Sequence, residues 1–209
     1  MTVLDPYPTL VDAPTLELAP AAQDLLFLEA RTANSFTTEA VTDVQIQAVY
    51  DLVKYGPTAM NAQPLRVLLI RSDEARARLI PHLSAGNRDK TSAAPLVAVL
   101  GYDVDFHDHL PTVFPPFPGA RDLFSDVASR HASGRDNAHL QAGYFLLGVR
   151  AAGLAAGPMG GFDPAGVDGE FFPDGKTRSI LIVNIGRPGP DAWFDRLPRL
   201  AYDDVVRAV

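Results

Sequence analysis

The sequence predicts an α+β protein with a central, mostly antiparallel sheet packed by helices. Helical and strand-like patterns are mixed along the chain, without the regular strand–helix alternation that indicates a parallel sheet. Apolar residues make up 47% of the 209 residues, which is enough for a substantial core. We expect one domain over residues 20–209, preceded by an arm over residues 1–19, where prolines interrupt any period.

Composition narrows the classes of function. A formal net charge of -7 disfavours nucleic acid and anionic membranes as partners, because both are bound through Lys and Arg patches. The chain has no cysteine, which excludes disulfides, thiolate metal ligands and cysteine nucleophiles. Its N-terminus lacks a signal-peptide pattern, and no apolar run approaches the ~20 residues that span a bilayer. These features predict a cytoplasmic enzyme that acts on small molecules.

Local signals mark the regular elements in order. Pro20 is suited to the first turn of a helix that we expect to end near Arg31. Thr42 and Gln45 have the spacing of a capping box, Ser72 is suited to a helix start, and Asp163 precedes Pro164 at another. Periodicity predicts helices over 44–54 and 135–152, and strands over 67–70, 95–101 and 180–185.

The pattern over 135–152 predicts the longest helix, which is apolar nearly all round and ends at Gly153. Such a helix is buried, either in the core or between subunits. The small residues Ala142, Gly143 and Gly148 allow a second helix to approach closely, which favours packing in a dimer.

The connection between the second helix and the first strand predicts a ligand site. Gly56 tolerates a left-handed turn and Pro57 cannot continue a helix, so the chain leaves α-helical geometry there. Residues 57–63, which we call the ligand loop, then supply Thr58, Asn61 and Gln63. These uncharged groups suit the edge of a flat heterocycle better than a metal ion. An ordinary helix-to-strand connection is the alternative.

Two later stretches allow competing interpretations. His107-Asp108-His109 contains metal-ligating residue types, but no third ligand cluster has suitable spacing, so we expect no metal site. The proline-rich stretch 110–120 is interpreted either as a mobile flap over a pocket or as a packed surface loop.

Four segments occur in an order that is similar to one known family. They are Pro57-Thr58-Ala59-Met60-Asn61-Ala62-Gln63-Pro64, Asn87-Arg88-Asp89-Lys90, Gly157-Pro158-Met159-Gly160-Gly161-Phe162-Asp163 and Arg196-Leu197-Pro198. The sequence therefore resembles the nitroreductase family of FMN-dependent, homodimeric oxidoreductases. Residues 87–91, 157–163 and 196–200 most resemble its malonic semialdehyde reductase (RutE-type) branch.

The resemblance implies an intertwined homodimer with two FMN sites. Arg31 and Arg196 would bind the phosphate, assisted by Thr32, Asn34 and Ser35. Asn87 and Lys90 would face the pyrimidine side of the flavin, where a fixed cation stabilises the reduced ring. The flavin would lie against Pro158, Met159, Gly160 and Gly161, and the partner chain would contribute Pro57, Thr58, Asn61 and Gln63. Solvated helix faces, surface ion pairs and a flexible turn are the alternatives at these positions.

By the same resemblance, NADPH or NADH would reduce FMN, which would pass the hydride to malonic semialdehyde and yield 3-hydroxypropionate. No catalytic side chain is required, because the cofactor carries the hydride. Three residues are candidates for the substrate carboxylate: Arg66, His131 and Arg135. A broad nitroaromatic or quinone reductase and a flavin-binding protein without turnover are the alternatives.

Overall fold

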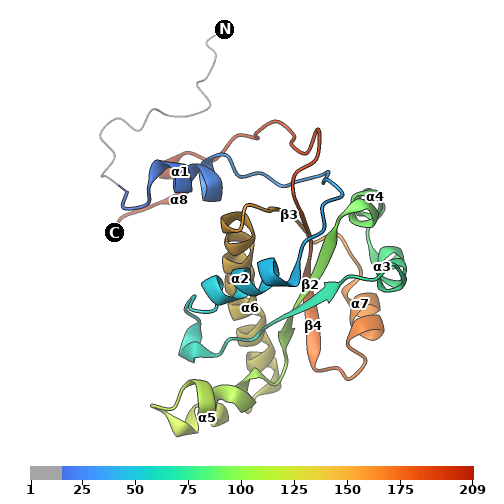
Figure 1. Cartoon of the computed structure of the whole chain (residues 1–209). Helices are drawn as coiled ribbons and strands as arrows, with labels where there is room; N and C mark the ends of the chain where they lie inside the picture. Colours follow the sequence, from blue (N-terminus) through green and yellow to red (C-terminus); the bar gives the residue numbers. More distant parts are fainter. Residues whose placement is uncertain (1–15) are drawn as a thin grey trace.

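A four-stranded sheet forms the centre of the molecule in the computed structural model, which describes residues 16–209 (Figure 1). The strands are β1 (Leu65–Ile70), β2 (Leu96–Asp103), β3 (Ala155–Met159) and β4 (Thr177–Gly186). They lie in the order β1-β2-β4-β3, and every neighbouring pair is antiparallel. The predicted mostly antiparallel sheet is confirmed. The predicted arm over 1–19 falls largely outside the described residues.

Helices cover both faces of this sheet. The α-helices are α1 (Pro20–Gln23), α2 (Asp43–Val53), α3 (Asp73–Leu79), α4 (Ala85–Ala93), α5 (Leu110–Val113), α6 (Val127–Ala151), α7 (Pro164–Phe171) and α8 (Tyr202–Val205). A π-helical turn, η1 (Asp24–Leu28), continues α1. The 3₁₀ segments are η2 (Ala59–Asn61), η3 (Ile80–His82), η4 (Phe106–His109) and η5 (Pro118–Phe124).

Helix starts follow the predicted caps. Thr42 and Gln45 form the complete capping box of α2. Ser72 accepts a hydrogen bond at the start of α3, and Asp163 does so at the start of α7. The first helical segment ends at Leu28 instead of near Arg31, because the chain there turns to run beside β3.

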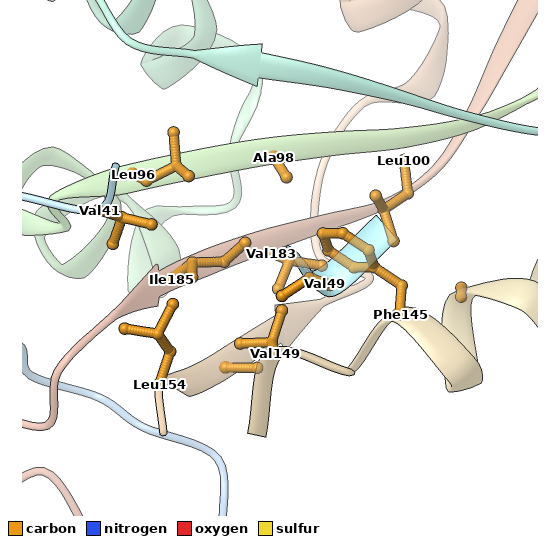
Figure 2. Packing of buried hydrophobic residues seen from close by; sticks show 12 residues of the cluster. Val41, Val49, Leu96, Ala98, Leu100, Phe145, Val149, Leu154, Val183 and Ile185 are labelled. Atoms are coloured by element: carbon orange, nitrogen blue, oxygen red, sulfur yellow. The ribbon is translucent and has the colours of Figure 1, made fainter. Parts of the chain in front are cut away.

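The two faces of the sheet have separate cores. On β2, Leu96, Ala98 and Leu100 belong to the cluster that packs against α2 and α6 (Figure 2). Val97 and Val99 point the other way and join the cluster that includes α3 and α7. All five side chains are fully buried, so the strand carries an uninterrupted apolar run with alternate residues facing opposite helical layers.

Close contact between α2 and α6 corrects one expectation about small residues. A Cβ on Gly148 would lie 2.4 Å from Val53 Cγ1 and 3.0 Å from Val49 Cγ1. The helix that approaches Gly148 is therefore α2 of the same chain, not a helix of a second chain. Ala142 is likewise buried in the core, whereas a Cβ on Gly143 would meet nothing within 4 Å.

Two helices differ from their predicted extent or burial. Helix α6 starts at Val127, eight residues before the apolar pattern, because Asp126 caps a polar first section. Its Leu140 is 47% exposed, although the pattern predicted burial all round. On α2, Val44 and Leu52 are 78% and 60% exposed, so only part of the predicted apolar face meets the core of this chain.

Strand β3 was not predicted, since Gly157 and Pro158 are poor strand formers. Pro158 pairs with Val183 at the edge of the described sheet, where a missing N–H is tolerated. The flexible-turn alternative is wrong for residues 157–159, which belong to β3. Among the described residues, no helix has the length and apolar content needed to cross a membrane.

Candidate functional site

Segments from the two ends of the described chain meet in one cavity of about 200 Å³. One wall comes from residues 30–34 and the other from residues 194–199. Arg31 Nη1 donates to the carbonyl oxygen of Phe194 at 3.3 Å, and Arg196 Nη2 donates to the carbonyl oxygen of Leu28. These crossed bonds hold the segments together and place both predicted phosphate arginines at the same cavity.

Each of these arginines keeps an unused donor. The Nε atoms of Arg31 and Arg196 are buried and have no hydrogen-bond partner within the described part of the chain. An unpaired buried N–H of a charged group is costly, so such a donor is expected to have a partner. A phosphate offers several acceptor oxygens and suits the planar guanidinium fork. The donors at this cavity therefore fit an anionic group such as a phosphate.

Other residues of the cavity determine its charge. Three arginines line it, and Asp195 is the one acidic residue among its lining residues. The third arginine, Arg199, was not among the predicted site residues. Thr32 and Asn34 line the cavity as expected, whereas Ser35 does not, because its hydroxyl donates to the carbonyl oxygen of Pro190 at 2.5 Å.

Strand β3 connects this cavity to the predicted flavin segment. The Ala33 N–H donates to the Ala156 carbonyl oxygen at 3.2 Å, so residues 31–34 run beside the strand. A Cβ on Gly157 would lie 2.7 Å from the Ala33 carbonyl oxygen. Glycine at 157 is required for this close approach. A Cβ on Gly160, by contrast, would meet nothing of the described chain within 4 Å, so that side of the backbone is open.

Helix α4 contacts the chain just after β3, at Gly161. Asn87 Nδ2 donates to the Gly161 carbonyl oxygen at 2.9 Å, and the same oxygen accepts from the Ser84 N–H at 3.0 Å. Asn87 and Lys90 lie on α4 with the predicted spacing of three residues, and both side chains are partly exposed. The backbone around Gly161 is thus fixed by α4, with an ammonium group one helical turn away.

The ligand loop contains unusual backbone geometry. Met60, Asn61 and Gln63 have φ values of 53°, 53° and 46°, in the left-handed region that favours glycine. Such conformations cost roughly 1–3 kcal/mol each and cluster at functional sites. Three such conformations within four residues make the ligand loop a candidate functional segment.

Helix α6 forms two hydrogen bonds with the ligand loop. The Ala59 N–H donates to Asn137 Oδ1 at 2.8 Å, and the Tyr144 hydroxyl donates to the Pro57 carbonyl oxygen at 3.1 Å. A Cβ on Gly56 would lie 2.3 Å from the Tyr144 ring, and Gly56 does not have a positive φ. Glycine is needed at 56 for the aromatic contact, not for the left-handed turn that the sequence suggested.

The stretch 110–120 packs against the ligand loop, as the packed-loop alternative expected. Leu110 and Ala120 are fully buried in a cluster with Ala62 and Phe106. Asn61 Nδ2 donates to the Val113 carbonyl oxygen at 2.8 Å. The ligand loop therefore lies at the α5 end of the molecule, away from α1 and α8 (Figure 1).

The three candidates for a substrate carboxylate lie apart from the arginine cavity. Arg66 pairs with Asp103 at 2.5 Å. His131 Nδ1 lies 3.0 Å from the Tyr102 hydroxyl, and burial raises the pKa of that phenol above its ordinary value. Arg135 is 62% exposed and lies 3.7 Å from Asp136. None of the three lines the cavity that contains Arg31 and Arg196.

Metal ligands do not gather in the described structure. Within residues 16–209, no three His, Asp or Glu side chains form a group that could hold a metal ion.

A second cavity of about 420 Å³ adjoins the arginine cavity and shares Ala30 and Arg31 with it. Trp193 and Arg150 also line it, and burial lowers the pKa of Arg150. Sequence patterns gave no signal for this cavity, because its walls are distant in the chain.

An antiparallel sheet between two helical layers, with an arginine-lined cavity where residues 30–34 meet residues 194–199, defines an α+β protein. The chain belongs to the Nitroreductase family, which it matches over residues 28–187. The fold expected from the resemblance is confirmed.

Relatives from several bacteria span nearly the whole chain. A Streptomyces coelicolor protein, provisionally named NADH dehydrogenase/NAD(P)H nitroreductase, is 63% identical over 196 residues, which cover 93% of this chain and 100% of that protein. A Leptothrix cholodnii protein with the same provisional name is 50% identical over 183 residues, which cover 87% and 93% of the two chains.

Solved structures share the fold at low sequence identity. A Bacillus subtilis structure, provisionally assigned as a nitroreductase, has a TM-score of 0.79 at 19% identity and covers 90% of this chain and 99% of its own. An Exiguobacterium sibiricum structure with the same provisional assignment was solved in complex with FMN. Its TM-score is 0.78 at 18% identity, with 93% of this chain and 100% of that chain covered.

Proposed function

We propose that this protein is an FMN-dependent oxidoreductase that uses NADPH or NADH. The observation that carries the proposal is the cavity where Arg31 and Arg196 present buried, unpaired Nε donors. Family membership, the names of the relatives and the FMN complex of a protein with the same fold support it. When bound, FMN supplies two-electron hydride chemistry, and the chain supplies binding and orientation.

Each part of the chain has a proposed role toward FMN. Arg31 and Arg196 bind the phosphate, and Thr32 and Asn34 add neutral hydrogen bonds. The backbone over 158–161 lies against the ring, with its orientation fixed by Asn87 through Gly161. Lys90 places a positive charge near the pyrimidine edge, where reduction adds negative charge.

A complete site requires two copies of the chain. The ligand loop lies at the α5 end, whereas residues 30–34 and 194–199, which line the arginine cavity, lie at the end of the molecule that carries α1 and α8 (Figure 1). One chain therefore holds two separate half-sites. We propose a homodimer in which the ligand loop of one subunit completes the cavity of the other. Exposed apolar residues on α2, including Val44 and Leu52, provide surface for the association.

Absorbance spectroscopy tests this function directly. Purified protein is mixed with FMN, freed of unbound flavin, and reduced anaerobically with NADPH or NADH. We expect a bound flavin spectrum that bleaches. Bound flavin that resists both donors would instead indicate a flavin-binding protein without turnover, and colourless protein after FMN addition would contradict the cofactor assignment.

Malonic semialdehyde is our proposed physiological acceptor. The support is the resemblance of residues 87–91, 157–163 and 196–200 to the malonic semialdehyde reductase branch. The relatives are instead named for NAD(P)H nitroreductase activity, so a broad nitroaromatic or quinone reductase is the competing function. Steady-state oxidation of NAD(P)H with malonic semialdehyde, nitrofurazone and a quinone separates the two. A higher kcat/KM for the nitro or quinone substrate would reject the aldehyde.

A further inference from the structure

We propose that Arg66 is a positioning residue that sets the conformation of the ligand loop at Gln63. This role replaces the one expected from the sequence, as a ligand of the substrate carboxylate. The inference rests on the proposed function only in assigning the ligand loop to FMN.

The guanidinium of Arg66 joins the ligand loop to the sheet. Its Nη1 donates to the carbonyl oxygens of Gln63 at 3.1 Å and Leu65 at 2.9 Å. Its Nη2 lies 2.5 Å from Asp103 Oδ2 on β2. Because the guanidinium is planar and its donors have fixed directions, these bonds orient the loop backbone relative to Asp103.

Gln63 needs this support because its backbone is left-handed, with a φ of 46°. Strained conformations persist only when surrounding contacts fix them. The Gln63 N–H donates to Thr58 Oγ1 at 3.2 Å, and its carbonyl oxygen accepts from Arg66. Both backbone polar groups of Gln63 are therefore occupied. Its side-chain amide, a proposed flavin contact, donates to the Asn61 carbonyl oxygen at 3.2 Å, within the same loop.

Asp103 is itself firmly held. Its Oδ1 accepts from the Asp105 N–H at 2.8 Å, and its own N–H donates to the Pro64 carbonyl oxygen at 2.9 Å. His109 Nε2 lies 3.4 Å from Oδ2, and the carboxylate side chain is 12% exposed. A largely buried carboxylate needs a cationic partner, which keeps the Arg66 guanidinium in place. Arg66 is consequently engaged and not available to a substrate carboxylate.

The test compares Arg66→Met with Arg71→Met. Arg71 is a matched control at the other end of β1. Its side chain is equally exposed, at 38%, pairs with Asp43 at 2.6 Å and donates to the Val41 carbonyl oxygen at 2.8 Å. Hydrogen exchange of the amides over 58–65 is measured without FMN, and the FMN Kd is measured by flavin fluorescence.

We expect Arg66→Met to speed exchange in the ligand loop and to raise the FMN Kd, each by about tenfold. Arg71→Met should leave both within about twofold of the unchanged protein. Arg66→Lys should give intermediate values, because one ammonium group cannot reproduce the fork. This conservative variant also serves if Arg66→Met does not fold.

Two results would overturn the positioning role. One is unchanged loop exchange in both Arg66 variants. The other is an equal increase of exchange in Arg66→Met and Arg71→Met, which would indicate general destabilisation. Failure of the unchanged protein to bind FMN would reject the proposed function instead, while the exchange comparison without FMN would still decide the role of Arg66.

Discussion

Arg31 and Phe194, which are 163 positions apart in the chain, are joined by a hydrogen bond from Arg31 Nη1 to the Phe194 carbonyl oxygen. This bond closes one side of the arginine cavity and leaves Arg31 Nε buried without a partner. The side chain thus fixes the C-terminal segment with one donor, while a second donor has no partner among the described residues.

The arginine cavity predicts selectivity for the flavin phosphate. Arg31→Met and Arg196→Met should each raise the FMN Kd by about tenfold or more, since a hydrogen bond to a charged group contributes roughly 1.5–3 kcal/mol. The Kd for riboflavin, which lacks the phosphate, should change little. Fluorescence titration with both flavins measures the difference.

Arg187→Met is the control for these variants. Arg187 pairs with Glu39 at 2.8 Å and does not line the arginine cavity. An equal loss of affinity for FMN and riboflavin in the cavity variants would contradict a phosphate role.

Because residues 31–34 lie so close to β3, we predict that a larger residue at position 157 lowers the stability of the fold. In Gly157→Ala, the new Cβ would begin 2.7 Å from the Ala33 carbonyl oxygen, so the backbone must shift. We expect a loss of about 1–3 kcal/mol in the free energy of unfolding. Gly169→Ala is the matched change, because nothing lies within 4 Å there, and it should be neutral or stabilising by up to about 1 kcal/mol. Equal denaturation midpoints for Gly157→Ala and Gly169→Ala would show that the contact between position 157 and the Ala33 carbonyl oxygen is not tight.

The proposed homodimer predicts that FMN binding depends on association of two chains. Leu52 on α2 is 60% exposed, and an aspartate there would place charge on an apolar surface. Leu52→Asp should shift the protein from dimer to monomer in sedimentation velocity and weaken FMN binding in parallel. Leu52→Met keeps the surface apolar and should retain both properties. A flavin-loaded monomer would contradict the shared site.

The Asp126 cap of α6 should make the stability of the fold depend on pH. A hydrogen bond from the Ser129 N–H, at 2.8 Å, holds the pKa of the Asp126 carboxyl below its ordinary value of 3.8. Because the folded-state pKa is the lower one, the stabilisation is present above pH 3.8 and is lost as pH falls through the folded-state value. Asp126→Asn keeps an acceptor oxygen but does not titrate.

The two proteins should therefore converge in Tm as pH is lowered from about 6 to about 2.5. Circular dichroism melts across this range provide the measurement. A difference in Tm that is independent of pH would show that the carboxylate charge contributes nothing to the cap.

Features with local causes could be predicted from the sequence. The capping box of Thr42 and Gln45 and the Asp163 cap need only neighbouring residues, and both are confirmed. The buried strands β2 and β4 were recognised from apolar runs. The irregular course of the chain after Gly56 and Pro57 was also predicted, although the left-handed backbone of Met60, Asn61 and Gln63 was not.

Features with distant partners could not be predicted from local patterns. Gly56 is required by the Tyr144 ring, and Gly157 by the Ala33 carbonyl oxygen, neither of which is near in sequence. Strand β3 forms despite Gly157 and Pro158, because pairing with β4 outweighs their weak strand preference. The engagement of Arg66 by Asp103 is likewise a property of the tertiary structure.

Because residues 194–199 supply one wall of the arginine cavity, the order of synthesis limits when the protein can acquire its ligand. A nascent chain on the ribosome contains Arg31 early, but it gains Arg196 only when nearly all of its 209 residues have been synthesised. If the cavity binds the flavin phosphate as proposed, flavin loading is a late event in biogenesis, and a product that stops before Arg196 is released with only one wall of the cavity.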